Sequence, residues 1–314
     1  QPDGDAAERR VLPDGAGAES AEGLSLATAP VHAPAALSPV IAGAWRLADW
    51  QWTPAQRLAW IEGNLDIGVS SFDVADIGGQ AGTEALFGEA LALRPALRRQ
   101  LQLVGTCVVT PGHAVDAQVQ SAVGQSLRAL RTDHLDLLLL HRPDPALDPD
   151  ALAAALDGLR RAGRVRQFGL GQAAPAVLAR LHDRLPLAAH QRTLSPLQPG
   201  ALHDGTLDQC QALGLRPMAW APLAGGRIFT GQDAAAVRLR GVLQAIAAER
   251  GVAVTTLVIA WVRRHASGPL PILGSRRIMV AREALAALTL QLDDATWRRI
   301  GAAAGIADDD ACSS

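Results

Sequence analysis

The sequence predicts an α/β protein whose strands and helices alternate in a closed (β/α)8 barrel. Eight short apolar runs alternate with longer amphipathic stretches along the chain. One run, residues 135–140, is almost entirely apolar, which is typical of a parallel strand covered on both faces. The 314 residues carry no internal repeat, and a barrel of this kind needs about 250 residues. One TIM barrel with a terminal extension therefore accounts for the chain.

Eight apolar runs are predicted to form the strands. In chain order they are residues 39–44, 69–73, 101–108, 135–140, 165–170, 186–190, 216–220 and 270–273. The stretches between them repeat apolar residues with helical spacing. These stretches are residues 54–66, 83–95, 116–131, 149–162, 174–183, 205–213 and 233–265. The last is long enough for two helices, which we expect to be broken at Gly251.

The first strand argues against an open, dinucleotide-binding sheet. Such a sheet carries a Gly-x-Gly-x-x-Gly turn directly after its first strand. The segment Gly43-Ala44-Trp45 does not supply that turn, which leaves the closed barrel as the better prediction.

Residues 1–36 differ in composition from the rest of the chain. They are rich in Ala, Gly, Pro, Asp and Glu and contain no aromatic residue. A segment of this composition cannot bury enough apolar surface to offset the entropy lost on ordering. We therefore predict a disordered N-terminal tail over residues 1–36 and the barrel over residues 37–314.

The composition excludes several classes of partner. The formal net charge is −2, from 29 basic and 31 acidic residues, so neither a nucleic acid nor a membrane is predicted as a partner. No run reaches the roughly 18 apolar residues of a membrane span. The three cysteines, Cys107, Cys210 and Cys312, match no metal-binding spacing, and their odd number argues against a disulfide scaffold. We expect a reducing compartment, the cytoplasm.

Candidate site residues are the polar and aromatic residues at the ends of the predicted strands, because barrels of this class place their active sites there. They are Asp73, Asp76, Thr106, Cys107, His141, Arg142, Gln172, His190, Gln191, Trp220, Ser275, Arg276 and Arg277. Taken singly, each is equally compatible with a buried core polar group or a helix cap. Cys107 has no base in its own segment and is predicted to be an apolar filler. For His190 a new catalytic role is one hypothesis.

Four segments resemble a bacterial aldo-keto reductase. They are FDVADIGGQAGTEALFGEAL (72–91), DHLDLLLLHRPDP (133–145), MAWAPLAGGRIF (218–229) and PILGSRR (271–277). Their order and spacing match that family across residues 37–304. The resemblance implies reduction of aldehydes and ketones with NADPH by an Asp-Tyr-Lys-His tetrad. In that tetrad, the Tyr hydroxyl protonates the carbonyl oxygen, and the Lys and His tune its pKa.

Two members of this tetrad are missing. By the resemblance, Asp73 matches the family's Asp and His141 its His, while Gly78 stands at the Tyr position and Thr106 at the Lys position. The chain contains no Tyr and no Lys, so neither group can be recruited from elsewhere in it. Removing a positioned general acid costs about 10²–10⁴ in rate. Ordinary tyrosine-dependent reduction is therefore not expected.

The resemblance also implies a weakened NADP(H) site. The implied contacts are Gln191 for the nicotinamide amide, Trp220 stacking on its ring, Leu223 along the pyrophosphate, Ser275, Arg276 and Arg277 for the 2′-phosphate, and Glu283 for adenine. Several family residues are replaced, by Gly171, Gln172, Val280 and Ala284. Trp45, Trp50 and Trp52 follow the first strand, where the family lines its substrate pocket. A small apolar or aromatic carbonyl compound is the predicted ligand.

Three functions remain open at this point. The first is a slow reductase that uses water or His141 as proton donor. The second, which we favour, is a pseudoenzyme that binds NADP(H) or a metabolite without turnover. The third is a redox-neutral dehydratase or isomerase with Asp73 or Asp76 and His141 as acid and base.

Overall fold

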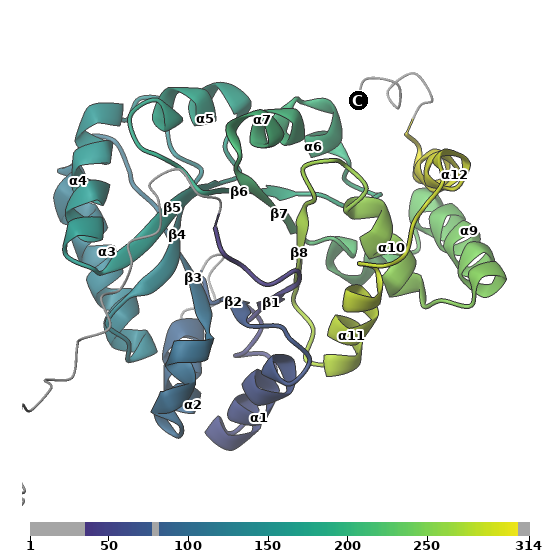
Figure 1. Cartoon of the computed structure of the whole chain (residues 1–314), viewed down its shortest axis with the longest axis horizontal. Helices are drawn as coiled ribbons and strands as arrows, with labels where there is room; N and C mark the ends of the chain where they lie inside the picture. The colour runs from purple at the N-terminus through teal and green to yellow at the C-terminus, as the bar shows by residue number, and fades with distance from the viewer. Residues whose placement is uncertain (1–34, 77–81, 307–314) are drawn as a thin grey trace, which may run out of the picture.

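The computed structural model describes residues 35–76 and 82–306, and within these ranges the predicted barrel is confirmed (Figure 1). Eight parallel strands pair in sequential order, and the eighth pairs with the first. The strands are β1 (Ile41–Gly43), β2 (Ser71–Asp73), β3 (Gln102–Cys107), β4 (Leu135–His141), β5 (Val165–Gly171), β6 (Ala189–Thr193), β7 (Arg216–Trp220) and β8 (Leu270–Leu273). The predictions for Gly78, Cys312 and residues 1–34 lie outside the described residues.

Helices surround the barrel (Figure 1). They are α1 (Pro54–Leu65), α2 (Thr83–Ala92), α3 (Val115–Leu130), α4 (Pro149–Arg161), α5 (Pro175–His182), α6 (Gly200–His203), α7 (Thr206–Leu213), α8 (Arg227–Thr230), α9 (Ala234–Arg250), α10 (Val254–Val262), α11 (Ile278–Ala286) and α12 (Asp294–Ala304), with 3-10 turns η1 (Pro95–Gln100) and η2 (Ala224–Gly226). The predicted break at Gly251 is confirmed, because α9 ends there in a left-handed conformation with φ 64°.

The sixth strand was predicted too early in the chain. Residues 186–190 contain an apolar run, but the hydrogen-bonded strand is Ala189–Thr193, paired with β5 and β7. Leu187 and Ala188 are buried before the strand begins. Most of the strand itself is polar, which hides it from a search for apolar runs.

The residues that precede β1 close the barrel at the amino-terminal ends of its strands. Ala35 is 1% exposed and packs with Leu37 against an inner cluster formed by residues of several strands. The Ala35 N–H also donates to the Ala188 carbonyl at 3.2 Å. Residue 35 is thus part of the packed barrel, and the predicted boundary after residue 36 falls inside it.

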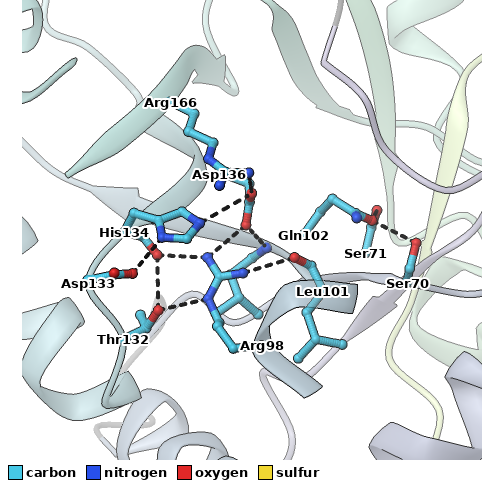
Figure 2. A network of polar contacts seen from close by, with 11 residues as sticks. Ser70, Ser71, Arg98, Leu101, Gln102, Thr132, Asp133, His134, Asp136 and Arg166 are labelled. Atoms are coloured by element: carbon cyan, nitrogen blue, oxygen red, sulfur yellow. Dashed lines mark hydrogen bonds and ion pairs between the residues drawn. The ribbon is translucent and has the colours of Figure 1, made fainter. Parts of the chain in front are cut away.

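A polar network joins the amino-terminal ends of three strands (Figure 2). The buried carboxylate of Asp136 on β4 accepts from Arg98 at 2.9 Å, from Arg166 at 2.9 Å and from the Leu103 N–H at 2.9 Å. Arg98 donates further to the carbonyls of Leu101 and His134. Asp136 therefore ties η1 and the strands β3, β4 and β5 together.

Helices α2 and α3 pack closely at Gly88, which gives a stability prediction. A Cβ on Gly88 would lie 2.1 Å from the Ala129 carbonyl oxygen, so the two helix backbones would have to separate. We expect Gly88→Ala to destabilise the fold by about 1–3 kcal/mol, as overpacked substitutions do. The measurement is denaturant unfolding.

A second glycine provides the control. Gly241 is exposed inside α9, and a Cβ there meets nothing within 4 Å. Gly241→Ala should stabilise the protein by about 0.4–1 kcal/mol because it restricts the unfolded chain. Equal effects of the two substitutions would show that the close packing of α2 on α3 is not a constraint.

Within the described ranges, no single helix is both long and apolar enough to cross a bilayer. Helices α9 and α10 meet the length and composition test only when taken together, and they are bent by 104° at the break between them.

Candidate active site

Five inward-facing positions lie at the carboxyl ends of neighbouring strands. Side chains alternate along a strand, and Val104, Leu139 and Ala189 belong to the inner cluster of the barrel. The residues two positions further on therefore face the same interior. These residues are Thr106, His141 and Gln191, and Gly171 pairs in register between the last two. Asp73 at the end of β2 completes the group, since it contacts Gln191 directly.

Asp73 is held by two neutral donors. The Gln191 amide Nε2 reaches across the barrel from β6 and donates to Asp73 Oδ2 at 3.0 Å, while the Ala75 N–H donates to Oδ1 at 3.3 Å. Asp73 is 7% exposed and Gln191 is 4% exposed. Burial raises the pKa of Asp73 to about 6, and the two hydrogen bonds only partly oppose that rise. Near neutral pH, this carboxyl therefore carries a proton part of the time.

Two polar atoms beside this pair have no hydrogen-bond partner within the described residues. They are Thr106 Oγ1 and His141 Nδ1, both inaccessible to solvent. Burial, and then the charge of Arg142, lower the pKa of His141, so its ring is neutral at physiological pH. A Cβ on Gly171 would lie 3.1 Å from His141 Nδ1 and 3.7 Å from Gln191 Oε1. The absence of a side chain at Gly171 thus leaves room next to the unpartnered nitrogen.

A cavity of about 670 Å³ opens between the ends of β7, β8 and β1. Its wall includes Trp45 and Trp220, whose ring centroids lie 6.4 Å apart. Trp45 lies so close to β8 that a Cβ on Gly274 would be 2.7 Å from its Nε1 atom. The further lining residues that matter here are Arg46, Leu223, Arg227, Phe229, Ser275, Arg277, Val280 and Glu283. The aromatic wall suits a ligand with a flat ring, and the guanidinium groups of Arg46, Arg227 and Arg277 suit a ligand with negative charge.

The comparisons with known proteins agree on one family. Residues 39–304 match the aldo/keto reductase family model. The chain belongs to the aldo/keto reductase family. It is therefore a member of an oxidoreductase family, as the four sequence segments predicted.

Individual family members resemble the whole barrel. The oxidoreductase YdhF of Escherichia coli is 43% identical over 281 residues, which cover 84% of this chain and 92% of that protein. The uncharacterized oxidoreductase YcsN of Bacillus subtilis is 39% identical, with 84% and 93% covered. An aldo-keto reductase from Klebsiella pneumoniae, solved in complex with NADPH, is 27% identical, with a TM-score of 0.72 and coverage of 84% of this chain and 90% of that one.

In this aldo/keto reductase, the predicted site residues divide into two groups. Asp73, His141 and Gln191 meet at the barrel mouth. The second group lines the cavity and comprises Trp220, Leu223, Ser275, Arg277 and Glu283. Arg276 is exposed and is not among the described residues that line the cavity. Gln191 is also absent from that lining, and its amide donates to Asp73.

Sequence reasoning missed two cations of the cavity. Arg46 stacks 4.6 Å above the Trp45 ring, and Arg227 forms an ion pair with Asp233 at 2.9 Å. Arg227 follows the Gly225-Gly226 turn in the segment MAWAPLAGGRIF, so its position was a usable signal. Arg46 follows Trp45 directly, and nothing in its own segment marks it as a ligand of the cavity.

The tryptophan prediction was only partly right. Trp45 lines the cavity, but Trp50 packs against Trp52 at 4.8 Å and against Trp60 of α1 at 5.3 Å. Both Trp50 and Trp52 lie against the core cluster outside the barrel. They are absent from the cavity lining and serve as packing for α1.

The structure does not support a catalytic role for His190. This residue lies between Ala189 and Gln191, which face the interior, so its side chain points to the outside of the sheet. It is fully buried there, and burial, followed by the charge of Arg192, lowers its pKa to about 4. Cys107 is confirmed as a buried filler, since burial raises the pKa of its thiol to about 12.

Proposed function

We propose that this protein binds NADP(H) in the cavity beside Trp220 and does not carry out ordinary tyrosine-dependent carbonyl reduction. The observation that carries the proposal is the environment of Asp73. Its donors among the described residues are two neutral amides, in a chain that contains neither Lys nor Tyr. The tuned phenol on which the family's proton transfer depends has no counterpart.

The residues present fit a dinucleotide. We assign Trp220 to the nicotinamide ring, Leu223 to the pyrophosphate segment, Ser275 and Arg277 to the 2′-phosphate and Glu283 to the adenine. The bound cofactor supplies a hydride. The NADPH complex of the Klebsiella pneumoniae protein, which shares the fold, supports the choice of cofactor. Gln191, held by Asp73, and the small Val280 support weakened binding.

The proposed substrate is a small apolar or aromatic carbonyl compound. Trp45 and the exposed Phe229 place flat apolar surface around the cavity, next to Trp220. Aromatic side chains of this kind bind ring systems by stacking and by burial of apolar area. We also propose a cytoplasmic location, because the described cysteines Cys107 and Cys210 are free and buried.

A redox-neutral reaction is the second candidate function. A partly protonated Asp73 and a neutral His141 with an unpartnered Nδ1 form an acid and a base at one barrel mouth. Such a pair suits a dehydration or an isomerisation.

Titration with NADPH separates the two candidate functions. Saturable binding of NADPH supports the first, and absence of binding supports the second. Binding is measured by calorimetry and by the change in intrinsic tryptophan fluorescence. Trp220→Phe is the control variant, in which this fluorescence change should be lost.

The preference for NADPH over NADH should depend on one of two adjacent arginines. Arg277 lines the cavity, and its backbone N–H donates to Ser275 Oγ at 3.2 Å, whereas Arg276 is not among the lining residues. We expect Arg277→Ala to weaken NADPH binding about 10- to 100-fold, the cost of losing charge-assisted hydrogen bonds. NADH binding should not change. Calorimetric titration of both nucleotides measures the two affinities.

Arg276→Ala is the matched control, because it removes the same charge from the neighbouring position. It should change the NADPH affinity little beyond the small effect of an exposed charge. If the two variants lose equal affinity, the phosphate is held by the general positive field of the segment, and the assignment of Arg277 is wrong.

A further inference from the structure

The barrel mouth contains a buried carboxyl group without a cationic partner. Within the described residues, no Arg or His forms an ion pair with Asp73, and the whole chain contains no Lys. Buried carboxylates normally require a cation or several donors to stay ionised. Among the residues that the structure describes, the donors to Asp73 are the Gln191 amide and the Ala75 N–H.

The charged and titratable groups around Asp73 leave it isolated. Asp76, three residues further on, accepts from the N–H groups of Gly82 and Glu84 at the start of α2. Glu84 on α2 is itself buried, and Cys107 at the end of β3 belongs to the outer core. On β4, His141 is the inward-facing group. No charge contributes to the pKa shift of Asp73, whose causes are burial and the two hydrogen bonds.

We propose that Asp73 is itself the proton donor for the carbonyl reduction that this protein retains, with Gln191 as its positioning residue. The proposal rests on the proposed NADP(H) binding. The orientation of the acid comes from the bond between Gln191 Nε2 and Asp73 Oδ2, which spans the barrel from β6 to β2. Thr106 Oγ1 and His141 Nδ1, both unpartnered, provide hydrogen-bonding atoms for the substrate at the same level of the barrel.

The step balances with groups already named. A bound NADPH would supply the hydride for the new C–H bond at the carbonyl carbon. The electron pair of the C=O π bond takes the proton of the Asp73 carboxyl, so an O–H bond forms and the carboxyl O–H bond breaks. Asp73 is left as a carboxylate and regains a proton from water. The products are an alcohol and NADP⁺.

The proposal fixes the sign of the pH dependence. Only protonated Asp73 can donate, and burial places its pKa at about 6. Reduction should therefore be fastest below that value and fall about tenfold per pH unit above it. A donor with the ordinary pKa of a tyrosine, near 10, would give a rate that stays level over the same range.

The first test detects the proton without turnover. Infrared difference spectra of the free protein between pH 5 and 8 should contain a protonated-carboxyl band that titrates near pH 6 and is absent in Asp73→Asn. Glu84→Gln is the matched control. Burial raises the pKa of Glu84 to about 7, so this variant removes a second, separate band. If no band is lost in Asp73→Asn, Asp73 is not an acid at these pH values and the proposal is overturned.

The second test follows the product. Protein saturated with NADPH that carries deuterium at C4 is incubated with an aromatic aldehyde, and the deuterated alcohol is quantified by mass spectrometry. Wild type and Glu84→Gln should form more alcohol at pH 5.5 than at pH 7.5, by about tenfold or more. In Asp73→Asn this dependence should disappear. In the infrared titration of the free protein, Gln191→Leu should shift the inflection of the Asp73 band to higher pH, because the bond from Gln191 lowers the pKa of Asp73.

The outcomes separate the two proposals. Calorimetry that detects no NADPH binding overturns both. NADPH binding with no deuterium transfer at any pH, or with the same pH dependence in wild type and Asp73→Asn, overturns the role of Asp73 alone. An unchanged inflection in Gln191→Leu removes Gln191 as the positioning residue.

Discussion

Gly78→Tyr combined with Thr106→Lys is expected to raise NADPH-dependent aldehyde reduction at neutral pH by about 10²–10⁴-fold. The reason is that, by the resemblance to the family, Asp73, His141 and Trp220 match its site residues, whereas the chain contains neither Tyr nor Lys to serve as the acid and its tuning cation. Thr106 faces the barrel interior, and its Oγ1 is unpartnered, so a side chain there points into the site. NADPH oxidation with a reactive aromatic aldehyde measures the gain.

The single variants serve as controls and should be strongly non-additive with the double variant. Gly78→Tyr alone adds a phenol whose pKa, near 10, is not tuned by a neighbouring cation, and it should gain little. Thr106→Lys alone places a cation near Asp73 and lowers the pKa of that carboxyl. It should therefore abolish the acid-favoured reaction proposed for Asp73. A folded, NADPH-binding double variant without any gain would show that the mouth has been rebuilt for other chemistry.

Asp136→Ala is expected to lower the free energy of unfolding by about 3–5 kcal/mol, the usual cost of breaking a buried ion pair. The substitution removes the acceptor of Arg98, whose side chain is 13% exposed, and leaves the Leu103 N–H without a partner (Figure 2). An uncompensated buried guanidinium is the main part of the loss. Urea unfolding followed by circular dichroism measures it.

Asp157→Ala is the control for this effect. Asp157 pairs with Arg160 and Arg161 on the surface of α4, where water screens the charges. Its removal should leave the unfolding midpoint almost unchanged. A similar loss in both variants would mean that Asp136 contributes no more than a surface pair, and that the network in Figure 2 does not hold the strands together.

The fold was readable from the sequence because burial on both faces produces apolar runs. Seven strands fall inside the predicted runs or extend past them by a single residue. The exception, β6, carries His190, Gln191 and Arg192 in place of the apolar residues that would mark it. Helices α11 and α12 had no predicted counterpart, although Asp293 caps α12 by accepting from the Thr296 N–H. That cap was a signal available in the sequence.

The site was only partly readable. Strand ends identify Asp73, His141 and Gln191 as candidates, because a parallel barrel brings all strand ends to one face. The bond between Asp73 and Gln191 joins residues 118 positions apart, so only the closed barrel reveals it. The same holds for Arg276 and Arg277, which are adjacent in sequence while only Arg277 lines the cavity.

The amide of Gln191 links two equilibria. If the nicotinamide amide of a bound cofactor draws Gln191 away, Asp73 loses a hydrogen bond that favours its ionised form, and its affinity for a proton rises. Reciprocity then requires that protonation of Asp73 strengthen cofactor binding by the same factor. Binding of NADPH would then be accompanied by uptake of a proton at Asp73. Cofactor affinity and acid strength would thus be set together by one side chain, and a substitution that tunes one of them would retune the other.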